Sequence, residues 1–148
     1  MRAINHTVTG ALIGAVIGNP VLALPAALLS HVVLDMIPHS GDIKGGHTGI
    51  WFKLELLVDA ALSAAFLLSL ALLQLSDWPI LIACGILGAA PDLLWFPYWV
   101  WELQGKSRKK DSLSNFLSRI QWSETTQGYY IEAIWLVGSL ALFFKVTS

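Results

Sequence analysis

His31 and Asp35 stand four residues apart in a stretch of the chain that is otherwise apolar. Residues i and i+4 share one face of a helix, so this imidazole and this carboxylate would point the same way. Together they offer the ligand types that zinc and other first-row divalent ions prefer. Ionisable groups inside apolar helices are costly and are usually functional or mutually paired. The spacing therefore predicts either a divalent metal site or a hydrogen-bonded pair that stabilises the protein.

Other histidines and carboxylates are placed where they could complete such a site. Pro38 ends the preceding helix near Ile37, so His39 can fold back toward the same ion. His6 arrives from the start of the first apolar segment, and Asp92 follows the helix-bending Pro91. The predicted metal ligands are His6, His31, Asp35, His39 and Asp92. The alternatives are a surface position for His6 and a solvated loop position for His39 and for His47.

Glu55 and Asp59 form a second pair with four-residue spacing in an apolar segment. If the protein is an enzyme, we expect either residue to act as a general base or to hold a second ion. The alternatives are simple exposure for Glu55 and an ordinary interhelical contact for Asp59. The same alternative applies to Glu132, one turn into the last apolar segment.

The elements that must position these residues belong to a membrane protein. Of 148 residues, 55% are hydrophobic and only 13% are charged, with a mean hydropathy of +0.64. Soluble domains carry about 25% charged residues. The net charge of -1 gives no basic face for nucleic acid. The single cysteine, Cys84, excludes an internal disulfide and a cysteine-based zinc cluster.

The apolar segments predict an all-α, polytopic transmembrane helical bundle in a single domain, residues 1–148. The first apolar block, 8–37, would measure about 45 Å as one helix, too long for a ~30 Å hydrocarbon core. Gly18-Asn19-Pro20 is a stop-start signal that divides it into a short hairpin or two thin spans. Gly10, Gly14 and Gly18 would allow a neighbouring helix to approach closely. About five membrane-embedded helices are expected, at 4–18, 20–37, 50–75, 79–101 and 128–145.

The polar connector 102–127 carries an additional helical pattern. Leu113, Phe116, Leu117 and Ile120 recur at helical spacing, which indicates an amphipathic helix on the membrane surface or a plain solvated connector. The aromatic cluster 95–101 is typical of the membrane–water interface.

Positive residues at 106–110 predict that this connector faces the cytoplasm. The loop 38–49 then lies at the same membrane face. The titratable side chains of the apolar helices and this loop would gather there as well: His6, His31, His39, His47, Asp35, Asp42, Glu55, Asp59, Asp92 and Glu132.

Two stretches resemble motifs of predicted membrane-bound metal-dependent hydrolases, the group of small inner-membrane proteins that includes the SOS-regulated hydrolase-like family. They are Asn5-His6 leading into Gly10, and the run Ser30–His39 with its Ser-His-x-x-x-Asp pattern. Pro91-Asp92 is similar to the family's Pro-Asp element, although it follows that run. The family's His-Arg-x-x-x-His element is missing. The resemblance implies a multi-pass protein of a prokaryotic inner membrane, with a fold like that of zinc-dependent phospholipases and a hydrolase activity.

Two functional interpretations follow. The first is a metal-dependent hydrolase acting on a lipid or a lipid-linked phosphate or ester at the cytoplasmic membrane face, with zinc, manganese or iron as the ion. Basic residues 106–110 would attract anionic lipid. The alternative is a non-catalytic membrane protein, either a scaffold or a metal- or proton-handling transporter subunit. The polar residues stop halfway across the membrane, which argues against a monomeric transporter. The expected partners are the lipid bilayer, a lipid-type substrate and further copies of the chain.

Overall fold

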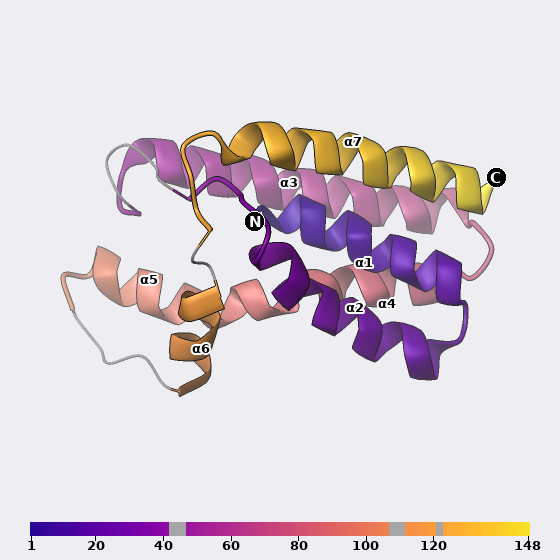
Figure 1. Ribbon diagram of the computed structural model, residues 1–148, viewed down its shortest axis with the longest axis horizontal. Helices are drawn as coiled ribbons and strands as arrows, with labels where there is room; N and C mark the ends of the chain where they lie inside the picture. The colour runs from indigo at the N-terminus through magenta and orange to yellow at the C-terminus, as the bar shows by residue number, and fades with distance from the viewer. Residues whose placement is uncertain (42–46, 107–111, 121–122) are drawn as a thin grey trace.

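The computed structural model describes residues 1–41, 47–106, 112–120 and 123–148 as a helical bundle (Figure 1). The predicted all-α fold is confirmed. Asp42 and the basic residues at 108–110 lie outside the described residues. The elements are α1 (Ala3–Ile17), α2 (Pro20–Asp35), α3 (Ile50–Leu73), α4 (Trp78–Ala89), η1 (Ala90–Leu94), α5 (Phe96–Leu103), α6 (Ser112–Ile120) and α7 (Gly128–Thr147).

α1 and α2 form the expected helical hairpin. Gly18 has φ 66°, a left-handed conformation that favours glycine and ends α1. Asn19 then caps α2, its side-chain oxygen accepting from the Val21 N–H at 2.9 Å. Pro20 occupies the first helical position, where its missing N–H costs nothing. Three residues thus reverse the chain, and the start of α1 lies beside the end of α2.

α1 is the central helix and packs against α2, α3, α4 and α7 (Figure 1). Its close approach to α4 depends on small residues, as the glycine stripe predicts. A side chain at Gly10 would collide with the Cys84 carbonyl, and one at Gly88 would collide with the His6 carbonyl. At Gly14 an added Cβ would lie 3.2 Å from the Cys84 side chain, a tight contact. On the other side, the Trp135 indole N–H donates to Thr9 Oγ1 at 3.0 Å and joins α7 to α1.

The outer helices present large apolar side chains to the surroundings. Three helical stretches are long and apolar enough to cross a membrane: Ile50–Leu73, Trp78–Leu103 and Gly128–Thr147. Leu57, Leu72 and Ile134 are 66%, 74% and 74% exposed, which a water-facing surface would not favour. α1 and α2 are shorter, at 15 and 16 residues. The protein is a membrane protein in which α1 is largely enclosed, while α2 buries one face and exposes Val21, Leu29 and Val33 on the other.

The stretch expected as one helix over 79–101 consists of three helical pieces. α4 ends at Ala89, a 3₁₀ turn covers Ala90–Leu94, and α5 begins at Phe96. Pro91 and Pro97 explain the breaks, because each lacks an N–H and its ring obstructs the carbonyl four residues earlier. Asp92 therefore lies on an irregular turn between helices.

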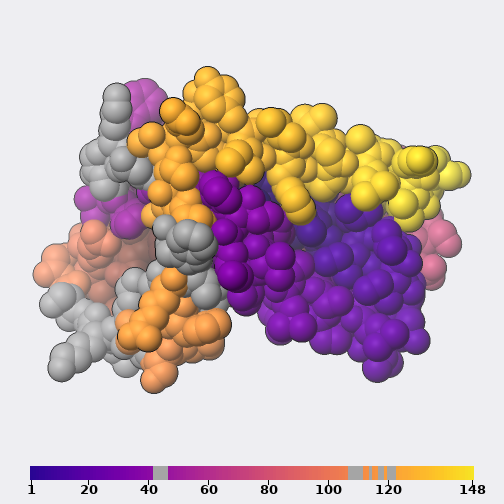
Figure 2. Space-filling model, viewed as in Figure 1, coloured from indigo at the N-terminus to yellow at the C-terminus, as the bar shows by residue number. Residues whose placement is uncertain are grey.

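The polar connector contains the helix that its periodicity predicts. α6 covers Ser112–Ile120, with Leu113 54% and Phe116 51% exposed. Residues 123–127 then run against the turn that follows α2, where the Thr125 N–H donates to the His39 carbonyl at 2.8 Å. In Figure 2, α7 lies along the upper edge of the visible face, with α1 and α2 below it.

Candidate metal centre

Four titratable side chains from three separate elements converge inside the bundle. They are His6 of α1, His31 and Asp35 of α2, and Asp92 of η1, and one potential ligand atom from each lies within 4.8 Å of the others. The first three are almost completely buried. Two imidazoles and two carboxylates form a donor set suited to zinc, manganese or iron.

The orientation of His31 is fixed by a backbone carbonyl. His31 Nδ1 lies 2.9 Å from the Gly88 carbonyl oxygen, which can only accept, so Nδ1 carries the proton. In a 3₁₀ turn this carbonyl would accept from residue 91, and proline has no N–H to donate. Pro91 thus leaves the Gly88 carbonyl free for His31. An N–H donated to a carbonyl is the arrangement that orients histidine ligands of metals.

The other ring nitrogen of His31 faces two carboxylates. Nε2 is 3.2 Å from Asp35 Oδ2 and 3.7 Å from Asp92 Oδ1. A bare lone pair on Nε2 would be repelled by both groups. This repulsion must be offset either by a proton on Nε2 or by a cation between the three side chains. A bound metal ion would supply that cation.

His6 stacks on His31, with the ring centroids 4.0 Å apart. Its Nε2 lies 3.1 Å from Asp35 Oδ1. Its Nδ1 is buried and has no hydrogen-bond partner among the described residues. A buried polar nitrogen without a partner is uncommon, and either ring nitrogen of a histidine can bind a metal. His6 therefore has unused capacity to bind an ion.

Asp35 also contacts a cation of the protein itself. The Met1 amino nitrogen lies 2.6 Å from Asp35 Oδ1, with both groups buried. With neutral imidazoles, the two carboxylates and this ammonium leave one negative charge. Buried charge must be paired, so the group requires a further proton or a metal ion. The four residues fit a divalent ion in ligand type and separation.

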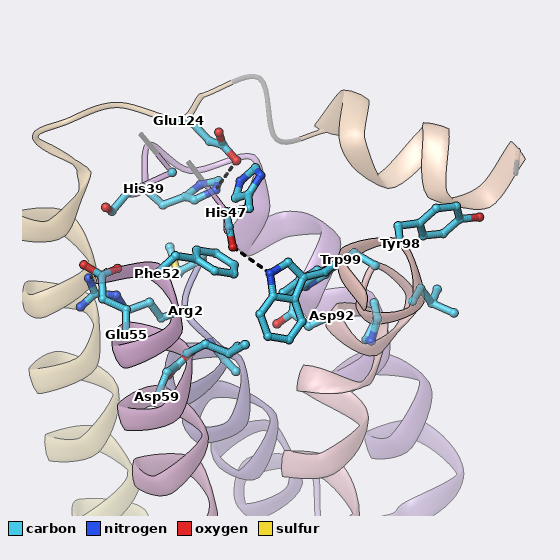
Figure 3. Close-up of a pocket in the computed structure, with 18 of the residues that line it drawn as sticks. Arg2, His39, His47, Phe52, Glu55, Asp59, Asp92, Tyr98, Trp99 and Glu124 are labelled. Carbon is cyan, nitrogen blue, oxygen red and sulfur yellow. Dashed lines mark hydrogen bonds and ion pairs between the residues drawn. The ribbon is translucent and has the colours of Figure 1, made fainter. Parts of the chain in front are cut away.

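The cluster opens on one side into a cavity of about 320 Å³ (Figure 3). His31 and Asp92 form part of its lining, and the Asp92 side chain is 21% exposed. The aromatic side chains of Phe52, Trp95 and Trp99 form an apolar part of the lining. The ring centroids of Phe52 and Trp95 are 5.8 Å apart. A molecule in the cavity would reach the cluster at its Asp92 side.

His39 lies outside the four-residue group. Its Nδ1 is 2.8 Å from the Ile37 carbonyl, and its Nε2 is 4.0 Å from Glu124 Oε1 across the cavity mouth. His39 is buried, and Gly128, the first residue of α7, packs directly on the His39 carbonyl. His39 and the cluster share the cavity, and its role as a ligand stays a prediction.

Asp59 holds the start of α1. Its two oxygens accept from the Ala3 and Ile4 N–H groups at 2.7 and 2.9 Å. This carboxylate satisfies donors that have no partner within the helix and lies at the positive end of the helix dipole. Glu55 is 3.5 Å from Arg2 Nη2 and is half exposed. Both residues line the cavity, and a catalytic role for either stays a prediction.

The remaining polar residues lie around the same end of the bundle. The His47 carbonyl accepts from the Trp99 indole at 2.7 Å, and both residues line the cavity. Glu132 Oε1 accepts from the Ser40 N–H at 2.9 Å and fixes the turn after α2 to α7. The expected gathering of titratable groups at one end holds for these described residues.

Sequence reasoning did not single out Arg2 or the Gly88 carbonyl. Arg2 lies between Glu55 and Glu132, and it lines two cavities of the protein. The sequence feature that could have indicated Arg2 is its position, as a lone cation ahead of an apolar block that carries a histidine. The signal for Gly88 was Pro91, because a proline three residues later leaves a carbonyl without its 3₁₀ donor.

No protein-family model matches the chain, and neither a curated protein nor a solved structure is significantly similar to it. The resemblance to membrane-bound metal-dependent hydrolases therefore stays a prediction.

Proposed function

We propose that this membrane protein is a metal-dependent hydrolase acting on a lipid or a lipid-linked phosphate or ester at the cytoplasmic membrane face. The supporting observation is the buried His6–His31–Asp35–Asp92 group, which opens to a cavity through Asp92. A divalent ion there, zinc first and manganese or iron as alternatives, would polarise a phosphoryl or ester oxygen and activate water.

The cavity suits a substrate that is both polar and apolar. Its lining combines the aromatic side chains with the charged residues Arg2, Glu55 and Asp59. A lipid head group fits this combination, because its charged end and its chain require different surroundings. Exposed Lys53 and Lys106 near this end support a cytoplasmic orientation in a cell membrane.

The alternative is a non-catalytic scaffold in which the cluster only stabilises the bundle. The ion pair between the Met1 amino group and Asp35 favours it, because this contact already offsets one buried charge. The two proposals differ in whether a metal ion is present.

Elemental analysis of the protein purified in mild detergent distinguishes them. The hydrolase proposal expects about one divalent ion per chain and its loss in the His31→Ala/Asp35→Ala double variant. His47→Ala is the matched control, since His47 lines the same cavity outside the four-residue group. Metal in the wild type and the control justifies a screen of phospholipid and lipid-phosphate esters. A wild-type protein that takes up no metal on reconstitution would refute the hydrolase.

A further inference from the structure

A second cavity, of about 390 Å³, lies between α3 and α7 over the start of α1. Its α3 side is a stripe at helical spacing that includes Leu54, Val58 and Leu62, and its α7 side includes Ala133 and Leu136. The three α3 side chains are 44%, 56% and 50% exposed, so the described part of the protein leaves this groove open. Both walls belong to helices that can cross a membrane, so the groove faces lipid.

The length of the groove matches one leaflet of a bilayer. From Trp51 to Leu62, which both line it, α3 rises about 17 Å. The hydrocarbon core is ~30 Å thick, so one leaflet contributes about half of that. A single acyl chain would therefore fill the groove along its length.

The polar end of the groove presents acceptors that lack donors. Asn5 Oδ1 and Glu132 Oε2 are buried, and neither has a hydrogen-bond partner among the described residues. Asn5 is 1% and Glu132 3% exposed, and both line the groove. Arg2 Nε lies 3.6 Å from Glu132 Oε2, an ion-pair distance. Buried acceptors without donors are costly, and a ligand bearing hydroxyl groups would satisfy them.

The groove borders the metal-site cavity. Arg2, Glu55 and Asp59 line both, so a molecule whose chain lies between α3 and α7 has its polar end at the cavity that contains Asp92.

We propose that the groove between α3 and α7 binds one acyl chain of a membrane lipid that carries free hydroxyl groups next to the chain, as a monoacylglycerol does. The assignment of this lipid class as substrate rests on the proposed hydrolase function. Binding in the groove does not require the metal. A helix from a second copy would cover the same apolar stripe but would leave Asn5 Oδ1 and Glu132 Oε2 without donors.

Photolabelling tests the proposal. The full chain, in phosphatidylcholine vesicles, is irradiated with a monoacylglycerol carrying a diazirine in its acyl chain, and labelled peptides are mapped by mass spectrometry. Phosphatidylcholine with the same diazirine chain is the comparison, because its head group has no hydrogen-bond donor. We expect label at Val58, Leu62 and Leu136 well above that at the outward-facing Leu57 and Ile134, and more label from the monoacylglycerol.

Two variants sharpen the result. Ala133→Phe fills the groove and should remove most of its label, while Ile134→Phe, at a 74% exposed position on the opposite face of α7, should not. Asn5→Leu removes one acceptor and should lower the preference for the hydroxyl lipid about fivefold, the effect of one neutral hydrogen bond. Excess unlabelled monoacylglycerol should suppress the label in wild-type protein, a measurement that needs no variant.

Three results would overturn the proposal. They are uniform label over groove and control positions, label that survives both Ala133→Phe and competition, and crosslinks only between copies of the chain. The same labelling of the His31→Ala/Asp35→Ala variant tests the lipid-binding groove separately from the hydrolase function. Groove label in a protein that binds no metal would retain the lipid site and reject the hydrolase. Bound metal with uniform label would reject the lipid site and leave the hydrolase proposal standing.

Discussion

Gly88 is the position where a single added methyl group should disturb both the fold and the metal centre. A Cβ there would lie 2.5 Å from the His6 carbonyl oxygen and 3.3 Å from Gly10 Cα. Both neighbours are backbone atoms of α1 and cannot rotate away. Restoring an ordinary contact of 3.4 Å requires α1 to move from α4 by about 0.9 Å.

This displacement acts on the cluster directly. His6 moves with α1, whereas the Gly88 carbonyl that orients His31 remains on α4. Metal sites tolerate errors of only about ±0.2 Å in ligand distance. We expect Gly88→Ala to weaken metal binding about 10- to 100-fold, the range found when groups that orient ligands are lost. Overpacking should lower the free energy of unfolding by about 1–3 kcal/mol.

Gly138→Ala is the matched control, because among the described residues no atom outside the local α7 backbone lies within 4 Å of the added methyl group. It replaces a glycine inside α7 and should leave stability unchanged or raise it by up to about 1 kcal/mol. Denaturant titration in detergent measures the free energy of unfolding, and competition with a chromophoric chelator measures metal affinity. Wild-type affinity in Gly88→Ala, or equal losses in both variants, would refute the argument from close packing.

Three further predictions concern neighbouring groups. Asp59→Ala should lower the free energy of unfolding by about 1–2 kcal/mol, because the α1 N–H groups lose their acceptor, while metal content stays unchanged; loss of metal without loss of stability would contradict this. His39→Ala should retain the metal, since the group of four lies apart from it, and elemental analysis would reveal a fifth ligand as a loss. Metal affinity should fall as pH drops below about 6.5, because protons compete for imidazole ligands; chelator competition at several pH values checks it, and a flat profile would exclude histidine ligation.

The helices were largely predictable because the membrane imposes a simple rule on sequence. Apolar runs of sufficient length must become helices when no water is present to satisfy the backbone. Gly18-Asn19-Pro20 marked the first turn for equally local reasons, and the observed helix limits follow it. The break at Ala90–Leu94 was not predicted, because hydropathy does not register a change from one helix to the next. Pro91 and Pro97 were the sequence features that indicate it.

The site was predictable in composition but not in arrangement. Spacing within α2 placed His31 beside Asp35, and the hairpin brought His6 to the same end. Which distant residues join them depends on the rotation and depth of α1 against α4, which the glycine contacts set. The same rotation turned Asp59 toward the first N–H groups of α1. Periodicity gives the face of one helix and carries no information about the partner it meets.

The central position of α1 has a consequence for biosynthesis. Asn5, His6, Thr7 and Thr9 are buried only because later helices surround them, and α7 is one of these. Gly128 follows Ile17 by 111 residues, and at ~5–20 residues per second ribosomes need roughly 6–22 s to make that stretch. For this interval the polar flank of α1 has no final partner in the membrane. Because α1 is made before the helices that enclose it, we expect ribosome stalling or truncation before α7 to leave it open to membrane proteases.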